Sequence, residues 1–180
     1  MTSLRERDPF DVRLARAAPA PLGAFNDAGV LSSADVQVAR RLARLGGVED
    51  APAVLLAIAL AVRAPRLGHV LVDLATIRTT VAVDTEEPVD LGALPWPEDV
   101  GAWVAEVAGC ALVAVGEEDD VAPGDARPLR LAGSRLYLDR YWREERQVAG
   151  ALLTRAAAPP AAPADLDAAL TRLYPVAEDE

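Results

Sequence analysis

The sequence predicts a mainly helical α+β domain with a small antiparallel sheet or hairpin. Residues 129–138 have the alternating pattern of a tight β-hairpin, and residues 51–62 are apolar on all sides, as in a buried helix. Further helical segments lie on either side of both. A chain of 19.0 kDa should bury about 70% of its unfolded surface, which is enough for one hydrophobic core.

The segment from Ser32 to Gly47 is predicted to be the first long helix. A serine, Ser32 or Ser33, offers an N-cap, and the glycine pair 46–47 ends the helix. Large aliphatic residues follow one another at helical spacing along this segment: Val38, Leu42 and Leu45.

The next predicted helix, residues 51–62, has Pro52 in its first turn, where a missing amide donor costs least. Because the helix is apolar all round, we expect it to lie between its neighbours at the centre of the domain. Its bulk comes from Leu55, Leu56, Ile58 and Leu60.

Short strands are expected at residues 70–72 and 111–115, and residues 79–83 are a further candidate. Short apolar runs of this kind do not by themselves separate strand from helix. Between them, a helix that starts at Pro97 carries a stripe expected to be buried: Val100, Trp103, Val104 and Val107.

The hairpin prediction extends to the pairing of individual residues. Gly133-Ser134 separates the two runs, and glycine in the first central position is typical of a two-residue type II′ turn. This register places Leu131 opposite Leu136, Leu129 opposite Leu138, and Arg130 opposite Tyr137. One face is therefore expected to be apolar and the other polar, with the helix from residue 141 packed against the hairpin.

Composition excludes several classes of function. The net charge of −10 repels phosphate and argues against a stand-alone, non-specific nucleic-acid binder. The chain has no lysine, so it contains neither a conventional phosphate-binding loop for ATP nor a lysine base. Its only cysteine, Cys110, has no partner for an intramolecular disulfide. The N-terminus lacks a signal-type apolar core and no apolar run is long enough for a bilayer, so we expect a cytoplasmic protein.

Few residues are candidates for catalysis. His69 is the only histidine, and its position at the start of a strand favours a structural role. Residues 84–90 and 117–120 form acidic loops, which could be solvated, could face another subunit or could bind a metal, although neither has an EF-hand pattern. We assign no catalytic, cofactor-binding or metal-binding residue. A small enzyme would need a cleft around His69 or these loops.

The densest mixture of arginine and aromatic residues lies on the hairpin and at the start of the helix that follows it. Such a mixture is enriched at protein interfaces and on surfaces that stack single-stranded DNA, but it also forms cores with local ion pairs. We name seven of these residues as a candidate partner interface: Arg130, Arg135, Tyr137, Arg140, Tyr141, Trp142 and Arg143.

Several segments together suggest a known family. The string from Gly133 to Glu145, GSRLYLDRYWREE, resembles the "RLYL-x-RYW-x-x-E" segment of the RecD family, the alpha subunit of exodeoxyribonuclease V (RecBCD). Residues 38–42 and 66–74 are similar to an earlier helix and to a "G-H-V-x-x-D-L" strand of that family, in the same order. Residues 170–175 resemble the short helix that precedes its helicase motifs.

The resemblance implies a role in assembly. RecD is the 5′-to-3′ helicase subunit of a heterotrimer with RecB and RecC that acts on DNA ends in recombination and double-strand-break repair. Its N-terminal domain docks the motor to RecC, and the motor uses ATP and Mg. This chain would then be an assembly domain without catalytic activity, in contact with DNA only through the complex. The alternative is a single-stranded DNA-binding module that uses the arginine and aromatic surface.

The resemblance to the RecD family also suggests three regions in the chain. We expect a partly ordered N-terminal arm over residues 1–27 and a RecD-like N-terminal domain over residues 28–158. Residues 159–180 would form an alanine and proline linker and a short helix that leads into the helicase core.

Overall fold

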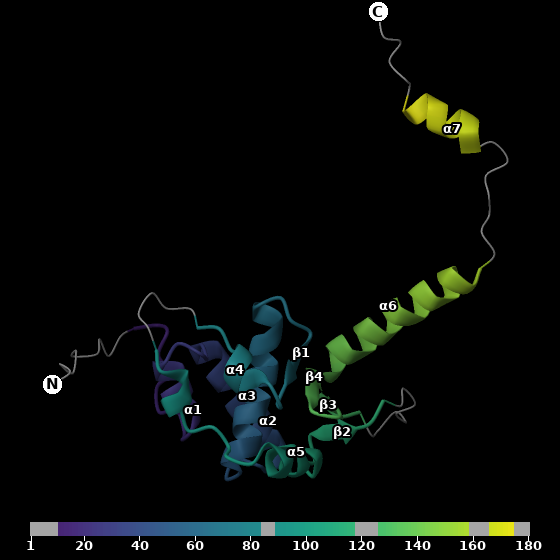
Figure 1. Ribbon diagram of the computed structural model, residues 1–180. Helices are drawn as coiled ribbons and strands as arrows, with labels where there is room; N and C mark the ends of the chain where they lie inside the picture. Colours follow the sequence, from purple (N-terminus) through teal and green to yellow (C-terminus); the bar gives the residue numbers. More distant parts are fainter. Residues whose placement is uncertain (1–10, 84–88, 118–125, 159–165, 175–180) are drawn as a thin grey trace, which may run out of the picture. The chain divides into compact units, whose positions relative to one another are not determined.

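The computed structural model describes residues 11–83, 89–117, 126–158 and 166–174 (Figure 1). The chain divides into two compact units, residues 1–145 and residues 146–180. The division falls within the helix α6.

In its described residues, the first unit combines helices with four short strands. Its helices are α1 (Leu22–Asp27), α2 (Ser33–Gly46), α3 (Pro52–Arg66), α4 (Ile77–Thr80), the 3-10 turn η1 (Leu91–Ala93), α5 (Val100–Ala108) and the first residues of α6 (Asp139–Ala157). Its strands are β1 (Leu71–Asp73), β2 (Val113–Val115), β3 (Leu129–Ala132) and β4 (Arg135–Leu138). This content confirms the α+β prediction.

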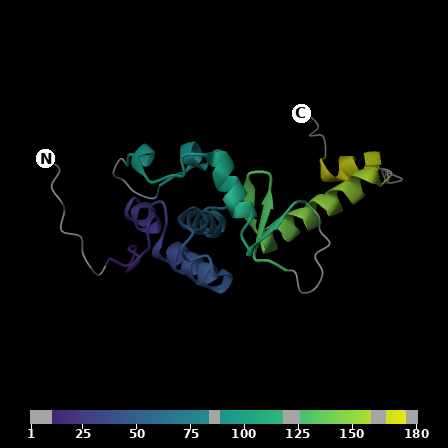
Figure 2. The same cartoon turned by 90° about the horizontal axis from the view of Figure 1, so that it is seen from below.

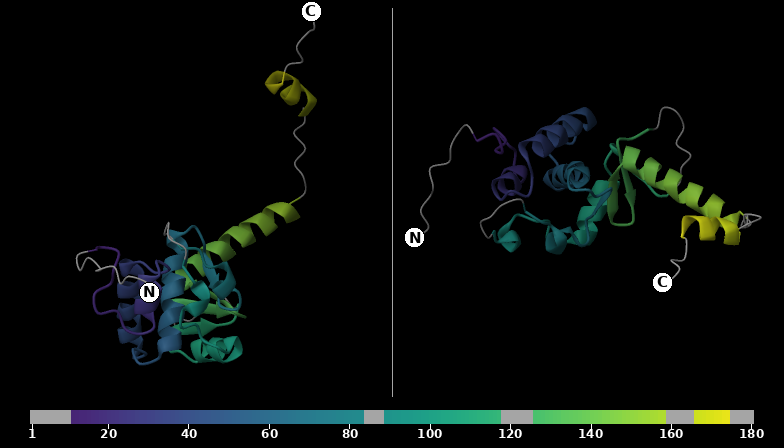
Figure 3. Two further views of the ribbon diagram at one scale, coloured as in Figure 1. Left: turned by 60° about the vertical axis from the view of Figure 1, so that its left-hand side comes forward. Right: turned by 90° about the horizontal axis from the view of Figure 1, so that it is seen from above.

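The apolar helix α3 is the centre of the first unit, as predicted. It contacts α2, α5 and the strands β1 and β4, so that it lies among its neighbours (Figure 3). The four residues expected to supply its bulk are all nearly inaccessible to solvent: Leu55, Leu56, Ile58 and Leu60. Trp103 of α5 is tied to the start of α3, because its indole Nε1 donates a 2.8 Å hydrogen bond to the carbonyl of Ala53.

A buried arginine near the end of α3 links three segments. Arg63 is 6% exposed, and its Nε donates a 2.7 Å hydrogen bond to the carbonyl of Val30. Its Nη2 bonds to the carbonyl of Ala82. Burial lowers the pKa of the guanidinium, and the neighbouring Arg66 lowers it further. Arg63 therefore satisfies backbone acceptors of two connecting segments that α3 itself does not reach.

Helix α2 begins and ends as the sequence predicts, and its buried face is not the one that carries the large aliphatic residues. Ser32 is the N-cap in a capping box with Asp35, and Gly47 closes the helix in the left-handed conformation with φ 65°. The side that packs inward is formed by smaller residues: Val36, Ala39 and Ala43. The small alanine side chains let α2 pack closely against α3, which Figure 2 shows beside it.

The stripe of large aliphatic residues along α2 is only partly buried. Val38 is 46% exposed and Leu45 is 65% exposed, whereas Leu42 is half-buried. Helical spacing correctly grouped these residues on one side, but it did not tell which side faces the core.

The sheet has the order β1-β4-β3-β2. The pairs β1–β4 and β3–β4 are antiparallel, and β2 lies parallel to β3. The predicted hairpin register is confirmed, with Leu129 opposite Leu138, Arg130 opposite Tyr137 and Leu131 opposite Leu136. In the turn, Gly133 has φ 62°, which glycine adopts without strain.

Three other local expectations differ from the structure. The candidate strand at residues 79–83 does not form, because residues 77–80 make the single helical turn α4. In α5, Trp103 and Val107 are buried, whereas Val100 is 38% exposed. The expected N-terminal arm, residues 1–27, includes α1, whose Leu22 and Phe25 are fully buried in the core.

The second unit contains the rest of α6 and the short helix α7 (Leu166–Leu173). Both carry exposed apolar side chains: Val148, Leu152 and Leu153 on α6, and Leu166, Leu170 and Leu173 on α7. None of the helices that could be assessed is long and apolar enough to cross a membrane.

Candidate partner-binding site

The second face of the hairpin is buried by the start of α6. Trp142 lies against Tyr137 in an edge-to-face arrangement with ring centroids 5.1 Å apart, and both side chains are almost inaccessible. The guanidinium of Arg130 lies 5.8 Å from the centre of the Trp142 ring. Together with Ala132, these rings form an apolar cluster separate from the main core. The face that alternation marks as polar is therefore covered.

One carboxylate connects this cluster to the surface. Asp139, the first residue of α6, accepts hydrogen bonds from Nε and Nη2 of Arg130 at 3.4 and 3.3 Å. It also accepts a 2.7 Å bond from Nε of Arg143, one helical turn away. Asp139 thus stabilises both a buried guanidinium and an exposed one, and it fixes where α6 begins relative to β3.

The environment of Tyr137 also favours the uncharged phenol. Burial raises the pKa of Tyr137 above its ordinary value, and the negative charge of Glu145 raises it further. A neutral, packed tyrosine of this kind supports the structure and is not available as a base.

The seven residues of the candidate partner interface fall into two groups. Three are buried and hold the hairpin to α6: Arg130, Tyr137 and Trp142. Four reach the surface, namely the half-buried Tyr141 and three arginines whose side chains are at least half exposed: Arg135, Arg140 and Arg143. Direct contact with a partner would therefore use the second group.

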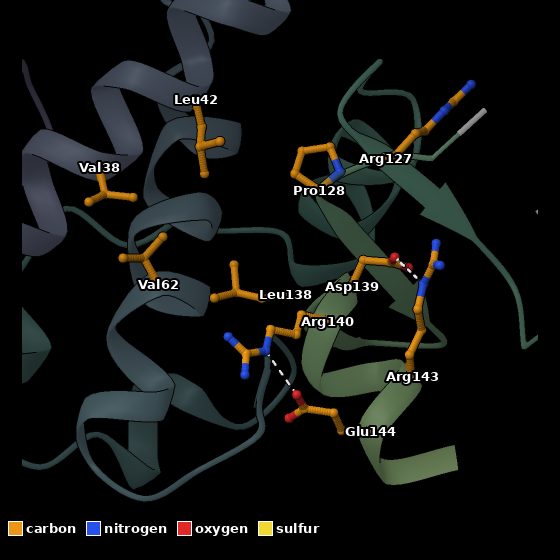
Figure 4. A pocket seen from close by; sticks show the side chains of 10 residues that line it. All are labelled: Val38, Leu42, Val62, Arg127, Pro128, Leu138, Asp139, Arg140, Arg143 and Glu144. Carbon is orange, nitrogen blue, oxygen red and sulfur yellow. Dashed lines mark hydrogen bonds and ion pairs between the residues drawn. The ribbon is translucent and has the colours of Figure 1, made fainter. Parts of the chain in front are cut away.

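Two of the exposed arginines border a groove, which Figure 4 shows from close by. The groove has a volume of about 610 Å³. Its floor and one wall are apolar and come from three elements and the residue before β3: Val38, Leu42, Val62, Leu138 and Pro128. Its rim is charged: Arg127, Asp139, Arg140, Arg143 and Glu144.

The rim arginines are already held in place. Arg140 donates a 2.8 Å hydrogen bond to Glu144, and Arg143 donates to Asp139 (Figure 4). Nη1 of Arg127 donates a 2.7 Å bond to the carbonyl of Val113. Each guanidinium thus has a defined position while part of it faces solvent.

Sequence reasoning found the charged side of this groove but missed its apolar side. In the sequence, Val38 and Leu42 belong to the predicted helix stripe, and Leu138 belongs to the predicted hairpin. A signal was present, because the opposite side of α2 carries alanines, which pack well against another helix. Nothing in the sequence indicated that β4 and the start of α6 lie next to α2.

The other candidate residues are not brought together. His69 is exposed and lines a separate hollow of about 240 Å³. Within the described ranges, no group of histidine, cysteine and acidic side chains could hold a metal ion. Most of both acidic loops, at residues 84–88 and 118–125, lies outside the described residues. At their edges, Asp90 accepts a hydrogen bond from the amide of Gly92, and Glu117 lies 3.5 Å from Arg135.

Comparison with known families identifies the chain. Residues 27–137 match the family described as "RecBCD enzyme subunit RecD, N-terminal domain". The chain belongs to the RecD N-terminal domain family. The match includes α2, α3 and most of the hairpin, and it ends just before the start of α6.

Relatives of this RecD N-terminal domain are found among mycobacteria. The chain is 42% identical over 172 residues to the RecBCD enzyme subunit RecD of Mycobacterium tuberculosis, in strains H37Rv and CDC 1551 / Oshkosh. It is 44% identical over 133 residues to the protein of the same name from Mycolicibacterium smegmatis. These alignments cover 94% and 74% of the chain, but only 26% and 20% of the respective relatives. The chain thus spans about a quarter of their length.

Proposed function

We propose that this chain is the subunit-assembly domain of a RecD protein and docks its 5′-to-3′ helicase motor to RecC. The parent protein would act in DNA repair and recombination as part of RecBCD, in the cytoplasm, using ATP and Mg in the motor. The chain itself would contribute no ATPase, helicase or nuclease chemistry.

The observation that carries this proposal is the apolar groove beside α2. Large aliphatic side chains that remain accessible next to a shaped hollow are typical of a surface that meets another protein. Val38 is such a residue, since it is nearly half exposed and lines the groove. The relatives are named as subunits of the RecBCD enzyme, which supports assembly with other subunits as the use of this surface.

The same proposal assigns a role to each region. Residues 28–158 would be the docking domain, and residues 159–180 would lead into the motor. The acidic loops would be solvated or would face another subunit.

Co-purification with RecC of the same organism tests the proposed function. The 180-residue chain and RecC should form a complex that persists at high salt, because apolar contacts carry most of its stability. A parallel titration of the chain with single-stranded DNA should give no binding at moderate salt. If the chain does not bind RecC but binds DNA, the assembly role is refuted and the DNA-binding alternative takes its place.

The DNA-binding alternative requires exposed aromatic rings on the hairpin and the start of α6. Bases stack on exposed aromatic rings, and the rings of Tyr137 and Trp142 are buried. Salt-sensitive DNA binding that disappears when Arg130, Tyr137 and Trp142 are substituted, in chains that stay folded, would favour it.

A further inference from the structure

The groove combines an apolar floor with a rim in which positive charge predominates. The rim contains three arginines, Arg127, Arg140 and Arg143, against the two carboxylates Asp139 and Glu144. Asp139 also faces the buried guanidinium of Arg130. This local excess of positive charge stands out in a chain with a net charge of −10.

The apolar floor limits what can occupy the groove. Nucleic acid would place phosphates over Val38, Leu42 and Val62, where no hydrogen-bond donor from those side chains can meet them. An apolar side chain fits such a floor, and the volume of about 610 Å³ lies within the range of binding clefts, about 300–1,000 Å³.

The rim limits the occupant further. A second copy of this chain, bound groove to groove about a twofold axis, would bring two arginine rims together. A segment with carboxylates beside its apolar residue would instead complement the rim. Arginine is well suited to this contact, because its planar fork can bind a carboxylate with two hydrogen bonds.

We infer that this groove binds a segment of the partner subunit in which one or two apolar side chains are flanked by aspartate or glutamate. The inference rests on the proposed assembly function and assigns the contact to the groove rather than to the tip of the hairpin. The apolar side chain lies against α2 and α3, and the carboxylates pair with the exposed arginines of α6.

Two matched pairs of variants separate this inference from its alternatives. Val38→Asp places a carboxylate in the groove, and Leu45→Asp makes the same kind of change on α2 outside it. Arg140→Glu reverses a charge on the rim, and Arg135→Glu reverses an exposed charge on the hairpin, outside the groove lining. Each pair has the same net charge, so any difference within it depends on position. Thermal unfolding of each variant shows that it is folded.

The measurement is the affinity of each folded variant for purified RecC. Val38→Asp should weaken binding at least about tenfold, as for a buried apolar anchor, and Leu45→Asp less than about twofold. Arg140→Glu should weaken binding several-fold at low salt and less at high salt, chiefly through slower association. Arg135→Glu should have little effect.

A crosslink identifies the occupant itself. In Val38→Cys, a photoreactive maleimide attaches to the new thiol, because the native Cys110 is buried. Irradiation of the complex with RecC should capture a RecC peptide that contains apolar residues next to aspartate or glutamate. Leu45→Cys is the control and should capture that peptide much less.

The outcomes test the groove inference separately from the assembly function. If wild-type chain binds RecC but Val38→Asp behaves like Leu45→Asp, the groove inference is wrong and the assembly function stands. A larger effect of Arg135→Glu than of Arg140→Glu would move the contact to the hairpin. Capture of a second copy, of the chain's own residues or of a lysine-rich peptide would also overturn the inference. A wild-type chain that does not bind RecC refutes both.

Discussion

Replacing Asp139 by Asn tests how the hairpin is held to α6. The substitution keeps the size of the side chain and removes its charge. In the native structure this carboxylate faces Arg130, whose side chain is 3% exposed, and Arg143, whose side chain is 56% exposed. The variant leaves the Arg130 guanidinium buried without its carboxylate.

The magnitude follows from the two contacts. Removing one partner of a buried ion pair costs about 3–5 kcal/mol. The contacts between Asp139 and Arg130 are long, at 3.3 and 3.4 Å, so we expect a loss of about 2–3 kcal/mol, at or below the lower end of that range. The exposed pair with Arg143 should contribute only about 0.3–0.5 kcal/mol.

Urea unfolding followed by tryptophan fluorescence measures the free energy of unfolding. Arg143→Ala is the matched control and should lower it by less than about 1 kcal/mol. Adding Arg130→Met to Asp139→Asn should recover part of the loss, because the double variant no longer buries a guanidinium that has lost its carboxylate. The coupling between positions 130 and 139 is then read from the double-mutant cycle.

Two results would refute this reasoning. Asp139→Asn could cost no more than Arg143→Ala, which would mean that the buried pair adds little. The double variant could also be less stable than Asp139→Asn alone, which would mean that Arg130 stabilises the cluster through its packing on Trp142 and not through Asp139.

Three further predictions concern buried side chains and close packing. Arg63→Met should lower the free energy of unfolding by about 2–4 kcal/mol, measured in urea, because two carbonyls lose a charged donor; an unchanged stability would contradict this. Gly46→Ala should destabilise the chain by about 1–3 kcal/mol, although alanine has the better helix propensity. The added Cβ would lie 2.5 Å from Cγ of the buried Leu112. The control is Gly150→Ala, whose Cβ meets nothing within 4 Å and which should not destabilise the chain. Burial raises the pKa of Tyr137 above 10.0, so above that pH the unfolded chain loses a proton that the folded chain retains, and stability falls as pH rises. Tyr137→Phe should remove this loss of stability at alkaline pH, measured by unfolding at a series of pH values. A pH profile identical to that of the wild-type chain would refute the prediction.

Local sequence patterns were sufficient for the hairpin and for the ends of α2. The turn at Gly133 and the alternation on either side leave one register in which all leucines share a face. A serine before a helix and a glycine after it satisfy backbone groups within a few residues. No distant contact is needed for either feature, which is why both predictions were confirmed.

Predictions failed where a distant segment decided the outcome. Residues 79–83 have the composition of a strand, but in the described part of the chain they pair with no strand, and residues 77–80 form a helical turn. Helix α2 carries a stripe of large aliphatic residues, but its alanine side packs against the core. The close approach of α3 leaves room only for small side chains between the two helices.

For this protein, sequence by itself determined the fold class, the central position of α3, the hairpin register and the likeness to the RecD family. Those features depend on periodicity, capping and residue order, all of which are local. Only the tertiary structure decided that Arg130, Tyr137 and Trp142 are buried and that Val38 and Leu42 border a groove. The burial depends on the first turn of α6 packing against the hairpin, and the groove depends on β4 and that turn lying beside α2 and α3. These contacts join residues far apart in the chain, so local patterns do not predict them.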